Sequence, residues 1–351
     1  MRAARSRRPM CLVSIIIVNT NTRELVCQCL ESVYANAPKF EFEIIVADNA
    51  STDGSCEAIA ARYPTVRLIR NERNLGFASA NNKGFEIARG KHMLMLNSDT
   101  VVLPGSIDLL LSALERDRTV GVVAPKLIYP DGSLQMSYGA MPSLFVTFCS
   151  FFEVRRWIPQ GLIKTLGSSA FKKLLGGSVS TYAQWLSGPG PRTSKLDKNN
   201  LATGACLLIR EECFKQVGPL DPAFFICADD ADYCKRVYDA GWEIEYLAEA
   251  TVVHIKGGTL GNRYRWTSPA AYQSVLYFLR KHRGRGVALV AKAFAVSSLA
   301  VRLIIKALVA PGEARGQWQL LKEVAATPIK FNRENVLAAT PLREEHGRPA
   351  D

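Results

Sequence analysis

The sequence lacks the cysteine pattern of a zinc-binding or disulfide-bonded module. Its 351 residues include nine cysteines, an odd set that contains no C-x-x-C pair. Zinc ribbons and disulfide frameworks use paired or evenly numbered cysteines, so the pattern argues against both classes. We interpret the cysteines as reduced thiols, which predicts a cytoplasmic protein.

Two small-residue patterns are also missing near the N-terminus. The apolar run at residues 12–18 is followed by Asn19, Thr20 and Asn21, and not by the G-x-G-x-x-G sequence of a dinucleotide-binding dehydrogenase. The run is short and no small-residue cleavage site follows it, which argues against a signal peptide.

Acidic residues are absent between positions 250 and 312, a stretch with ten Lys and Arg. The whole chain has 44 Lys and Arg against 32 Asp and Glu, a formal net charge of +12. This excess indicates an anionic partner, namely nucleic acid, an acidic membrane surface or a phosphorylated small molecule.

A long apolar run without charges is missing as well. Residues 287–310 are apolar enough to suggest a membrane span, but Lys292, Arg302 and Lys306 interrupt them. Each cation would cost about 2.5–3.5 kcal/mol near the centre of a bilayer. We therefore expect a basic amphipathic helix that lies in the membrane interface, with the aromatic run at residues 144–152 as a second contact. The alternative is that both segments are ordinary core.

Short β-branched runs alternate with helical patterns in the first third of the chain. The predicted strands are residues 12–18, 42–47, 66–70 and 92–96. The predicted helices between them are residues 25–34, 55–62 and 78–89. Such alternation is typical of βαβ units and predicts an α/β fold with a mostly parallel, Rossmann-like sheet flanked by helices.

The pattern is less regular in the middle of the chain. After a predicted helix at 106–116, a long irregular region extends from about residue 135 to 201. Regular structure is predicted again at residues 205–209, 211–217, 230–240 and 243–247.

Polar residues follow each of the first four predicted strands. They lie at residues 19–21, 48–54, 71–76 and 97–99. Ligands bind beyond the carboxyl ends of strands in an open α/β sheet, so these residues are candidates for one site. Asp48 or Asp53 could accept hydrogen bonds from a nucleotide, and Asp99 is suited to Mg²⁺ or Mn²⁺. Each segment taken alone could equally be a turn or a helix cap.

A second acidic cluster, Asp229, Asp230 and Asp232, begins a predicted helix. Three carboxylates there repel one another unless a metal, an arginine or a proton-transfer role offsets the repulsion. His254 follows a strand-like segment and could be a metal ligand or a buried neutral ring.

Several of these segments resemble one known family. The stretches VSIIIVNTN (13–21), EIIVADNASTDGS (43–55), NERNLGFASANNKG (71–84) and LNSDT (96–100) are similar to the nucleotide-sugar half of family 2 glycosyltransferases, which have the GT-A fold. The stretches ATGACLLIR (202–210), FFICADDADYCKRVYDAGWEIEY (224–246) and VVH (252–254) are similar to the acceptor half. The resemblance covers roughly residues 11–260 and is strongest to the rhamnosyltransferase-like branch of bacterial cell-envelope enzymes.

The resemblance implies a role for each matching residue. The implied nucleotide-sugar-binding residues are Thr20, Asp48, Asp53, Asn74, Gly76, Asn97, Ser98 and Asp99. Asp99 would be the metal-binding acid of a D-x-D motif whose first position is Asn97 here, and His254 would be a second ligand of Mn²⁺ or Mg²⁺. Asp230 matches the catalytic base, and Asp229 and Asp232 match its supporting neighbours.

The resemblance also implies the reaction. Residues 262–266 differ from the Q-x-x-R-W motif of processive polymerases, which favours transfer of a single sugar. We expect an inverting transferase that moves L-rhamnose from dTDP-rhamnose to a hydroxyl of a lipid-linked or envelope glycan. Donors with UDP-linked galactofuranose, glucose or N-acetylglucosamine remain alternatives, as does a nucleotide-sugar-binding protein without catalysis. A nucleic-acid partner is not expected.

The expected organisation has four parts. They are a basic N-terminal arm (1–10), the nucleotide-sugar half (11–135), the acceptor and catalytic half of the same domain (136–260), and a helical membrane-associating extension with a tail (261–351). We expect the protein to sit peripherally on the cytoplasmic, inner face of the cell membrane.

Overall fold

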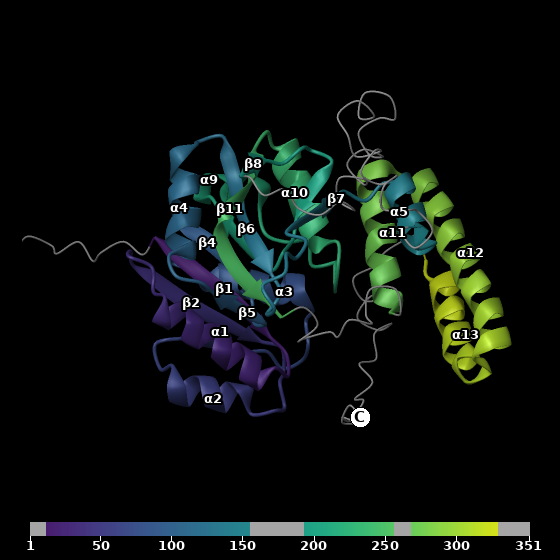
Figure 1. The fold of residues 1–351 in the computed structure, drawn as a ribbon, viewed down its shortest axis with the longest axis horizontal. Helices are drawn as coiled ribbons and strands as arrows, with labels where there is room; N and C mark the ends of the chain where they lie inside the picture. The colour runs from purple at the N-terminus through teal and green to yellow at the C-terminus, as the bar shows by residue number, and fades with distance from the viewer. Residues whose placement is uncertain (1–11, 155–192, 256–267, 329–351) are drawn as a thin grey trace, which may run out of the picture.

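The protein is described by a computed structural model that covers residues 12–154, 193–255 and 268–328 (Figure 1). The strands are β1 (Val13–Asn19), β2 (Phe42–Asp48), β3 (Arg67–Arg70), β4 (His92–Asn97), β5 (Thr100–Val102), β6 (Val120–Ile128), β7 (Tyr138–Ala140), β8 (Ser194–Lys195), β9 (Asn200–Ala202), β10 (Cys206–Ile209) and β11 (Glu243–His254). The helices are α1 (Arg23–Ala35), α2 (Ser55–Arg62), α3 (Phe77–Ile87), α4 (Ser106–Arg116), α5 (Leu144–Phe151), α9 (Glu211–Val217), α10 (Asp229–Asp239), α11 (Pro269–Arg283), α12 (Arg285–Val309) and α13 (Pro311–Ala326).

One mixed sheet of nine strands organises the described residues. Its order is β3-β2-β1-β4-β10-β6-β11-β5, and β8 pairs with β11. The first four strands in this order are mutually parallel, and β11 is parallel to β6. Strand β10 runs antiparallel to both of its neighbours, and β5 and β8 run antiparallel to β11. The predicted α/β class with a mostly parallel sheet and a C-terminal helical extension is confirmed.

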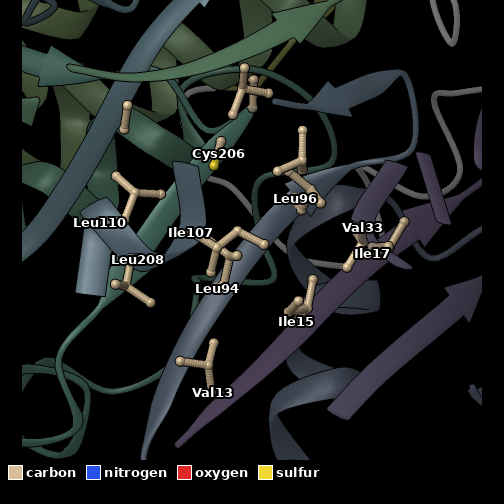
Figure 2. Close-up of a cluster of buried hydrophobic side chains, with 14 of the residues drawn as sticks. Val13, Ile15, Ile17, Val33, Leu94, Leu96, Ile107, Leu110, Cys206 and Leu208 are labelled. Atoms are coloured by element: carbon tan, nitrogen blue, oxygen red, sulfur yellow. The ribbon is translucent and has the colours of Figure 1, made fainter. Parts of the chain in front are cut away.

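The predicted strand at the N-terminus is buried on both faces, as its uninterrupted apolar run indicates. Val13, Ile15 and Ile17 of β1 point into one hydrophobic cluster with α1, α4 and the facing residues of β4 and β10 (Figure 2). Ile16 points into a second cluster with α3, α9, α10 and α11. The two clusters hold the helices against opposite faces of the sheet and so set the position of the strand ends.

Two segments differ from the sequence prediction. The aromatic run at residues 144–152 was expected in an irregular region, but it forms helix α5, whose first turn is capped by Ser143 Oγ accepting from Val146 N at 3.2 Å. Residues 243–247 and 251–253 form one strand, β11, with a register shift between Leu247 and Thr251. A local hydrophobic pattern does not show this continuity, because the shift interrupts the alternation of buried side chains.

The C-terminal helices pack on one another and on α5, beside the sheet (Figure 1). A small core of Phe151, Tyr272, Ala295, Leu299, Leu320 and Val324 joins them. Within the described residues, α12 is the one helix whose length and composition would suffice to cross a membrane. The predicted basic arm at 1–10, residues 262–266 and the expected boundary between residues 260 and 261 lie outside the described residues.

Candidate active site

The carboxyl ends of β1, β2 and β4 meet at one edge of the sheet. Their register pairs Asn19 with Asp48 across β1 and β2, and Val18 with Asn97 across β1 and β4. Asn19 Nδ2 donates to Asp48 Oδ2 at 2.8 Å, and Asp48 Oδ1 accepts from Ser51 N at 2.8 Å. These bonds hold the buried Asp48 carboxylate in one orientation, and its remaining lone pairs can still accept from a ligand.

Asp53 joins the first turns of two helices. Its Oδ2 accepts from Arg23 N at 2.8 Å, and its Oδ1 accepts from Ser55 N at 3.0 Å. Burial alone would raise the pKa of Asp53, but these hydrogen bonds outweigh it and lower the pKa. The structure thus gives Asp53 a role in joining α1 to α2, and its predicted contact with the nucleotide stays a prediction, as does that of the half-buried Thr20. Ser98 is buried, with its Oγ 3.3 Å from Thr22 Oγ1.

The loop after β3 touches the segment that leads into α10. Asn74 Oδ1 accepts from Gly76 N at 2.8 Å, and Phe77 N donates to Phe225 O at 3.1 Å. Gly76 has a φ of +79°, and a Cβ atom there would lie 2.7 Å from Phe225 O. Only glycine suits this position, which brings the predicted nucleotide loop next to the predicted catalytic segment.

Four residues without the freedom of glycine adopt left-handed backbone conformations around these loops. They are Asn21 (φ 48°), Ala50 (φ 60°), Cys227 (φ 63°) and Ala228 (φ 59°). The last two directly precede α10. Such conformations cost about 1–3 kcal/mol each and cluster at functional sites.

Asp99 and His254 form the second part of the site. Strands β5 and β11 pair antiparallel with His254 opposite Thr100, and Ile255 N donates to Asp99 O at 2.8 Å. The pairing brings His254 Nε2 to 3.2 Å from Asp99 Oδ1 and 3.5 Å from Asn97 Nδ2. All three predicted residues therefore converge, although His254 lies 155 residues after Asp99.

Gln135 determines which nitrogen of His254 carries the proton. Its Nε2 donates to His254 O at 3.0 Å, so its Oε1 is the atom that lies 2.6 Å from Nδ1 and accepts from it. A neutral imidazole with its proton on Nδ1 presents a lone pair at Nε2. This is the arrangement in which a histidine binds a metal ion.

The atoms of this cluster fit a divalent cation. Asp99 Oδ1 and Asn97 Oδ1 are buried without a hydrogen-bond partner among the described residues. Asp99 Oδ1 and His254 Nε2 face each other at 3.2 Å. Two neighbouring ligands of an octahedral ion with bonds of about 2.1 Å lie about 3 Å apart, so this separation suits a shared ion. No third His, Cys, Asp or Glu joins the pair in the part of the chain that the structure describes.

Backbone hydrogen bonds of Gly204 and Ala205 connect Asp230 to this cluster. Its Oδ2 accepts from Gly204 N at 3.3 Å, and the following residue, Ala205, accepts through its carbonyl from Asn97 N at 2.9 Å. A Cβ atom on Gly204 would lie 3.4 Å from Asp230 Cβ, so the small residue allows the close approach.

The three acids at the start of α10 have different environments. Burial, together with the charge of Asp230, raises the pKa of Asp229 well above its usual range. Asp232 is fully buried and binds Arg236 Nε at 2.8 Å, Lys281 Nζ at 2.6 Å and His282 Nε2 at 2.8 Å. The repulsion expected among the three acids is thus offset by the cations Arg236 and Lys281 at Asp232, the second of which comes from α11.

Two residues of the site escaped the sequence analysis. Gln135 had no signal, since it lies 119 residues before His254 and in a region predicted to be irregular. Gly204 stands in the ATG segment at 202–204, where a glycine directly before a buried strand was the available signal.

The sheet, and the acids and amides that its carboxyl edge and α10 bring together, define a nucleotide-sugar transferase fold of the GT-A type. GalNAc-T7, solved with UDP, GalNAc and Mn²⁺, superposes with a TM-score of 0.52 at 15% identity over 77% of this chain and 48% of that chain. The mannosyltransferase PcManGT from Pyrobaculum calidifontis, solved with GDP-Man and Mn²⁺, superposes with a TM-score of 0.50 at 17% identity over 91% of this chain and 87% of that chain.

The chain belongs to glycosyl transferase family 2, and it is a glycosyltransferase of the rhamnosyltransferase-like branch. The family described as "Glycosyl transferase family 2" matches residues 14–172. The N-acetylglucosaminyl-diphospho-decaprenol L-rhamnosyltransferase of Mycobacterium tuberculosis is 32% identical over 260 residues, which is 69% of this chain and 76% of that protein. The O-antigen biosynthesis protein RfbC of Myxococcus xanthus is 26% identical over 270 residues, 74% of this chain and 19% of that protein. The predicted family and fold are confirmed.

Proposed function

We propose that the protein is an inverting glycosyltransferase that moves one L-rhamnose from dTDP-rhamnose to a hydroxyl of a lipid-linked or cell-envelope glycan. The sugar and the lipid-linked acceptor are supported by the mycobacterial relative, whose name gives an L-rhamnosyltransferase acting on an N-acetylglucosaminyl-diphospho-decaprenol. One observation carries the catalytic proposal, which is the position of Asp230 beside the Asp99–His254 pair. Asp230 accepts a hydrogen bond from Gly204 N, and the next residue, Ala205, accepts one from Asn97 N. Asn97 in turn lies next to His254 and Asp99.

The nucleotide would bind at the ends of β1 and β2. Asp48 has lone pairs beyond its hydrogen bonds with Asn19, Ser51 and Cys56, and a carboxylate there can accept from the imide N–H of thymine or uracil. A carboxylate also accepts from N1–H of guanine, so the expected pyrimidine nucleotide rests on the resemblance to the rhamnosyltransferase-like branch. Thr20, Asp53, Asn74, Gly76 and Ser98 would complete the donor site.

Asp99 and His254, with the side-chain oxygen Oδ1 of Asn97, would hold Mn²⁺ or Mg²⁺. A divalent ion supplies positive charge that stabilises the diphosphate as it leaves. Gln135 keeps the lone pair of His254 at Nε2, which is the atom that faces Asp99.

Asp230 would act as the general base. The acceptor hydroxyl oxygen forms a bond to the anomeric carbon while the bond from that carbon to the diphosphate oxygen breaks, and the hydroxyl proton moves to the Asp230 carboxylate. Attack from the face opposite the leaving group inverts the configuration. Asp232 is less suited to this role, because Arg236, Lys281 and His282 already bind its two oxygens.

A UDP-linked donor is the second candidate, because Asp48 would accept equally well from uracil. Galactofuranose, glucose and N-acetylglucosamine are the sugars to compare. As a protein acting on a lipid-linked acceptor, the enzyme would sit peripherally on the inner face of the cell membrane.

Calorimetric titration of dTDP-rhamnose, UDP-galactose, UDP-glucose and GDP-mannose into the purified protein with Mn²⁺ tests the proposal. We expect dTDP-rhamnose to bind most tightly and Asp48→Ala to weaken it about tenfold or more, since removal of one buried charged partner costs about 1.5–3 kcal/mol. Glu57→Ala, an exposed acid on α2, is the control and should bind like the wild type. Preferential binding of GDP-mannose would contradict the proposed donor, and unchanged binding by Asp48→Ala would contradict the role of Asp48.

A further inference from the structure

Helix α12 exposes apolar side chains to solvent, whereas a helix on an ordinary protein surface exposes polar ones. Its solvent-facing side carries Val290, Val301, Ile304, Ile305, Leu308 and Val309, of which Ile304 is 61% exposed and Leu308 and Val309 are each 79% exposed. We call these six residues the α12 face. They recur at helical spacing along about 28 Å of the helix, and α12 lies at the outer edge of the molecule (Figure 1).

Three of the four cations of α12 point the other way. Lys292 Nζ donates to Thr327 O at 2.8 Å, and Lys306 pairs with Glu313 at 2.8 Å. Arg302 pairs with Glu153 at 3.1 Å and donates to Phe151 O at 2.5 Å. The charges that appear to interrupt the apolar segment in the sequence are therefore bonded to neighbouring parts of the protein, and the α12 face itself is uncharged.

Helix α5 extends the apolar surface. Phe145 and Phe148 are both exposed, and the ring of Phe148 contacts that of Phe294 on α12 edge-to-face at 5.3 Å between centroids. Exposed apolar surface of this extent on neighbouring helices marks a contact with another molecule or a membrane.

Two arginines lie at the N-terminal end of α12. Arg283 ends α11 and Arg285 begins α12, and both are exposed. No acid occurs in α11 or α12, and the neighbouring Lys281 and His282 are bound to Asp232. We call Arg283 and Arg285 the basic corner.

We propose that the α12 face, with Phe145 and Phe148, inserts into the headgroup region of an anionic lipid bilayer while the basic corner contacts the lipid phosphates. An apolar helix face with cations at one end has the chemistry of a helix that lies in a membrane interface. A second copy of the chain is the competing occupant, and the vesicle and oligomer measurements below distinguish the two.

Helix α12 does not cross the bilayer in this arrangement. Helix α13 packs along it and exposes Glu313, Arg315, Lys322 and Glu323. A spanning α12 would carry these charges into hydrocarbon, at a cost of about 2.5–3.5 kcal/mol for each basic or acidic group near the centre. A helix lying along the surface leaves them in water.

The basic corner is also attached to the candidate active site. Lys281 and His282, next to the corner, bind Asp232 in the first turn of α10, two residues from Asp230. A bilayer that holds the corner therefore lies close to the catalytic helix, where a lipid-linked acceptor must arrive. This last consequence rests on the proposed function, whereas the insertion itself does not.

Sedimentation of the full-length protein with lipid vesicles, without donor or acceptor, tests the insertion. We expect binding to vesicles of phosphatidylcholine with phosphatidylglycerol, and weaker binding to phosphatidylcholine alone. Ile304→Asp and Leu308→Asp should each weaken binding about tenfold or more, because each removes apolar burial in the membrane. Leu109→Asp on α4, at an exposed leucine remote from the C-terminal helices, is the control and should bind like the wild type.

The basic corner is tested separately. Arg283→Gln and Arg285→Gln should each weaken binding to the anionic vesicles about fivefold and leave binding to phosphatidylcholine unchanged. Added salt should reduce the wild-type preference in the same way. Urea unfolding of each variant checks that the fold is intact.

Three results would overturn the insertion: wild-type protein that stays in solution with both vesicles, α12 variants that bind like the wild type, or a dimer that Ile304→Asp converts to a monomer without any effect on vesicle binding. The α12 variants should still transfer sugar to a water-soluble acceptor fragment. If an α12 variant loses vesicle binding but keeps this activity, the α12 face serves membrane binding and not catalysis. If the wild type binds vesicles but shows no transferase activity, the proposed function is contradicted and the insertion is not.

Discussion

The chemistry of the site depends on single hydrogen bonds to buried side chains. Gln135 uses its amide nitrogen on the backbone carbonyl of His254, so its oxygen accepts from Nδ1 and leaves the lone pair at Nε2. The distance of 3.2 Å from Nε2 to Asp99 Oδ1 then suits two ligands of one ion.

Gln135→Leu should therefore weaken Mn²⁺ binding about 10–100-fold, the usual effect of removing a group that orients a histidine ligand. Mn²⁺ titration followed by electron paramagnetic resonance measures this. Gln216→Leu, an amide on the remote helix α9 that bonds Trp242, is the control. Chelation with EDTA should abolish transfer, and Mn²⁺ or Mg²⁺ should restore it. Full activity in EDTA would refute the metal site.

Asp230 is the acid best placed to accept a proton. Asp229 is buried with a raised pKa, which favours its protonated form, and Asp232 is already bound by Arg236, Lys281 and His282. Asp230→Asn keeps the shape of the side chain and removes the base, so kcat should fall about 10²-fold or more while the donor Kd stays within about twofold. Single-turnover kinetics and donor titration separate the two. Near-normal turnover would move the role to Asp229 or Asp232.

Helices α10 and α11 are joined by the buried carboxylate of Asp232. Burial alone would raise the pKa of Asp232, but hydrogen bonds from His282 and Lys281 and the charge of Arg236 outweigh it and lower the pKa to about 2. A folded-state pKa below the unfolded value of about 3.9 stabilises the fold above about pH 4, and the stabilisation disappears as the pH falls to about 2. The difference corresponds to roughly 2.5 kcal/mol.

Asp232→Asn should lower the free energy of unfolding by about 3 kcal/mol at neutral pH, because it leaves Arg236 and Lys281 without the buried carboxylate that pairs with them. Urea unfolding measures this at pH 7 and again near pH 3, where the difference from the wild type should shrink. Asp239→Asn on the same helix breaks an exposed pair with Lys235 and should cost less than about 0.5 kcal/mol. Equal effects of the two variants would show that Asp232 does not join the helices.

The C-terminal helices share a hydrophobic core with the sheet. One hydrophobic cluster contains Ile16 and Met95 of the sheet together with Leu276 and Phe278 of α11 and Ala288 of α12. Tyr272 and Phe151 are fully buried, and their other neighbours in the core come from α12 and α13. The C-terminal extension is thus part of the same core as the transferase fold.

Truncation after Gly284 should therefore expose buried aromatic side chains and produce an aggregating chain without a single cooperative unfolding transition. Size exclusion and urea unfolding followed by circular dichroism test this. A soluble truncated protein with a sharp transition would contradict it. Point variants of the α12 face are for this reason the better probes of membrane binding.

The strands, the acids at their ends and the family could all be predicted from the local pattern of residues. An uninterrupted run such as residues 12–18 can be buried only between two layers, and polar residues that end parallel strands must meet at one edge. Both features depend on neighbours a few residues apart, so the pattern along the chain is sufficient to find them.

The contacts between distant groups and the directions of charged side chains could be found only in the folded structure. His254 reaches Asp99 through the pairing of β5 with β11, Gln135 reaches His254 across 119 residues, and Asp232 faces α11. The inward direction of Arg302 on α12 follows from α5, since Glu153 and Phe151 O provide its partners. These contacts depend on packing between segments far apart in the chain, which no local hydrophobic or charge pattern contains.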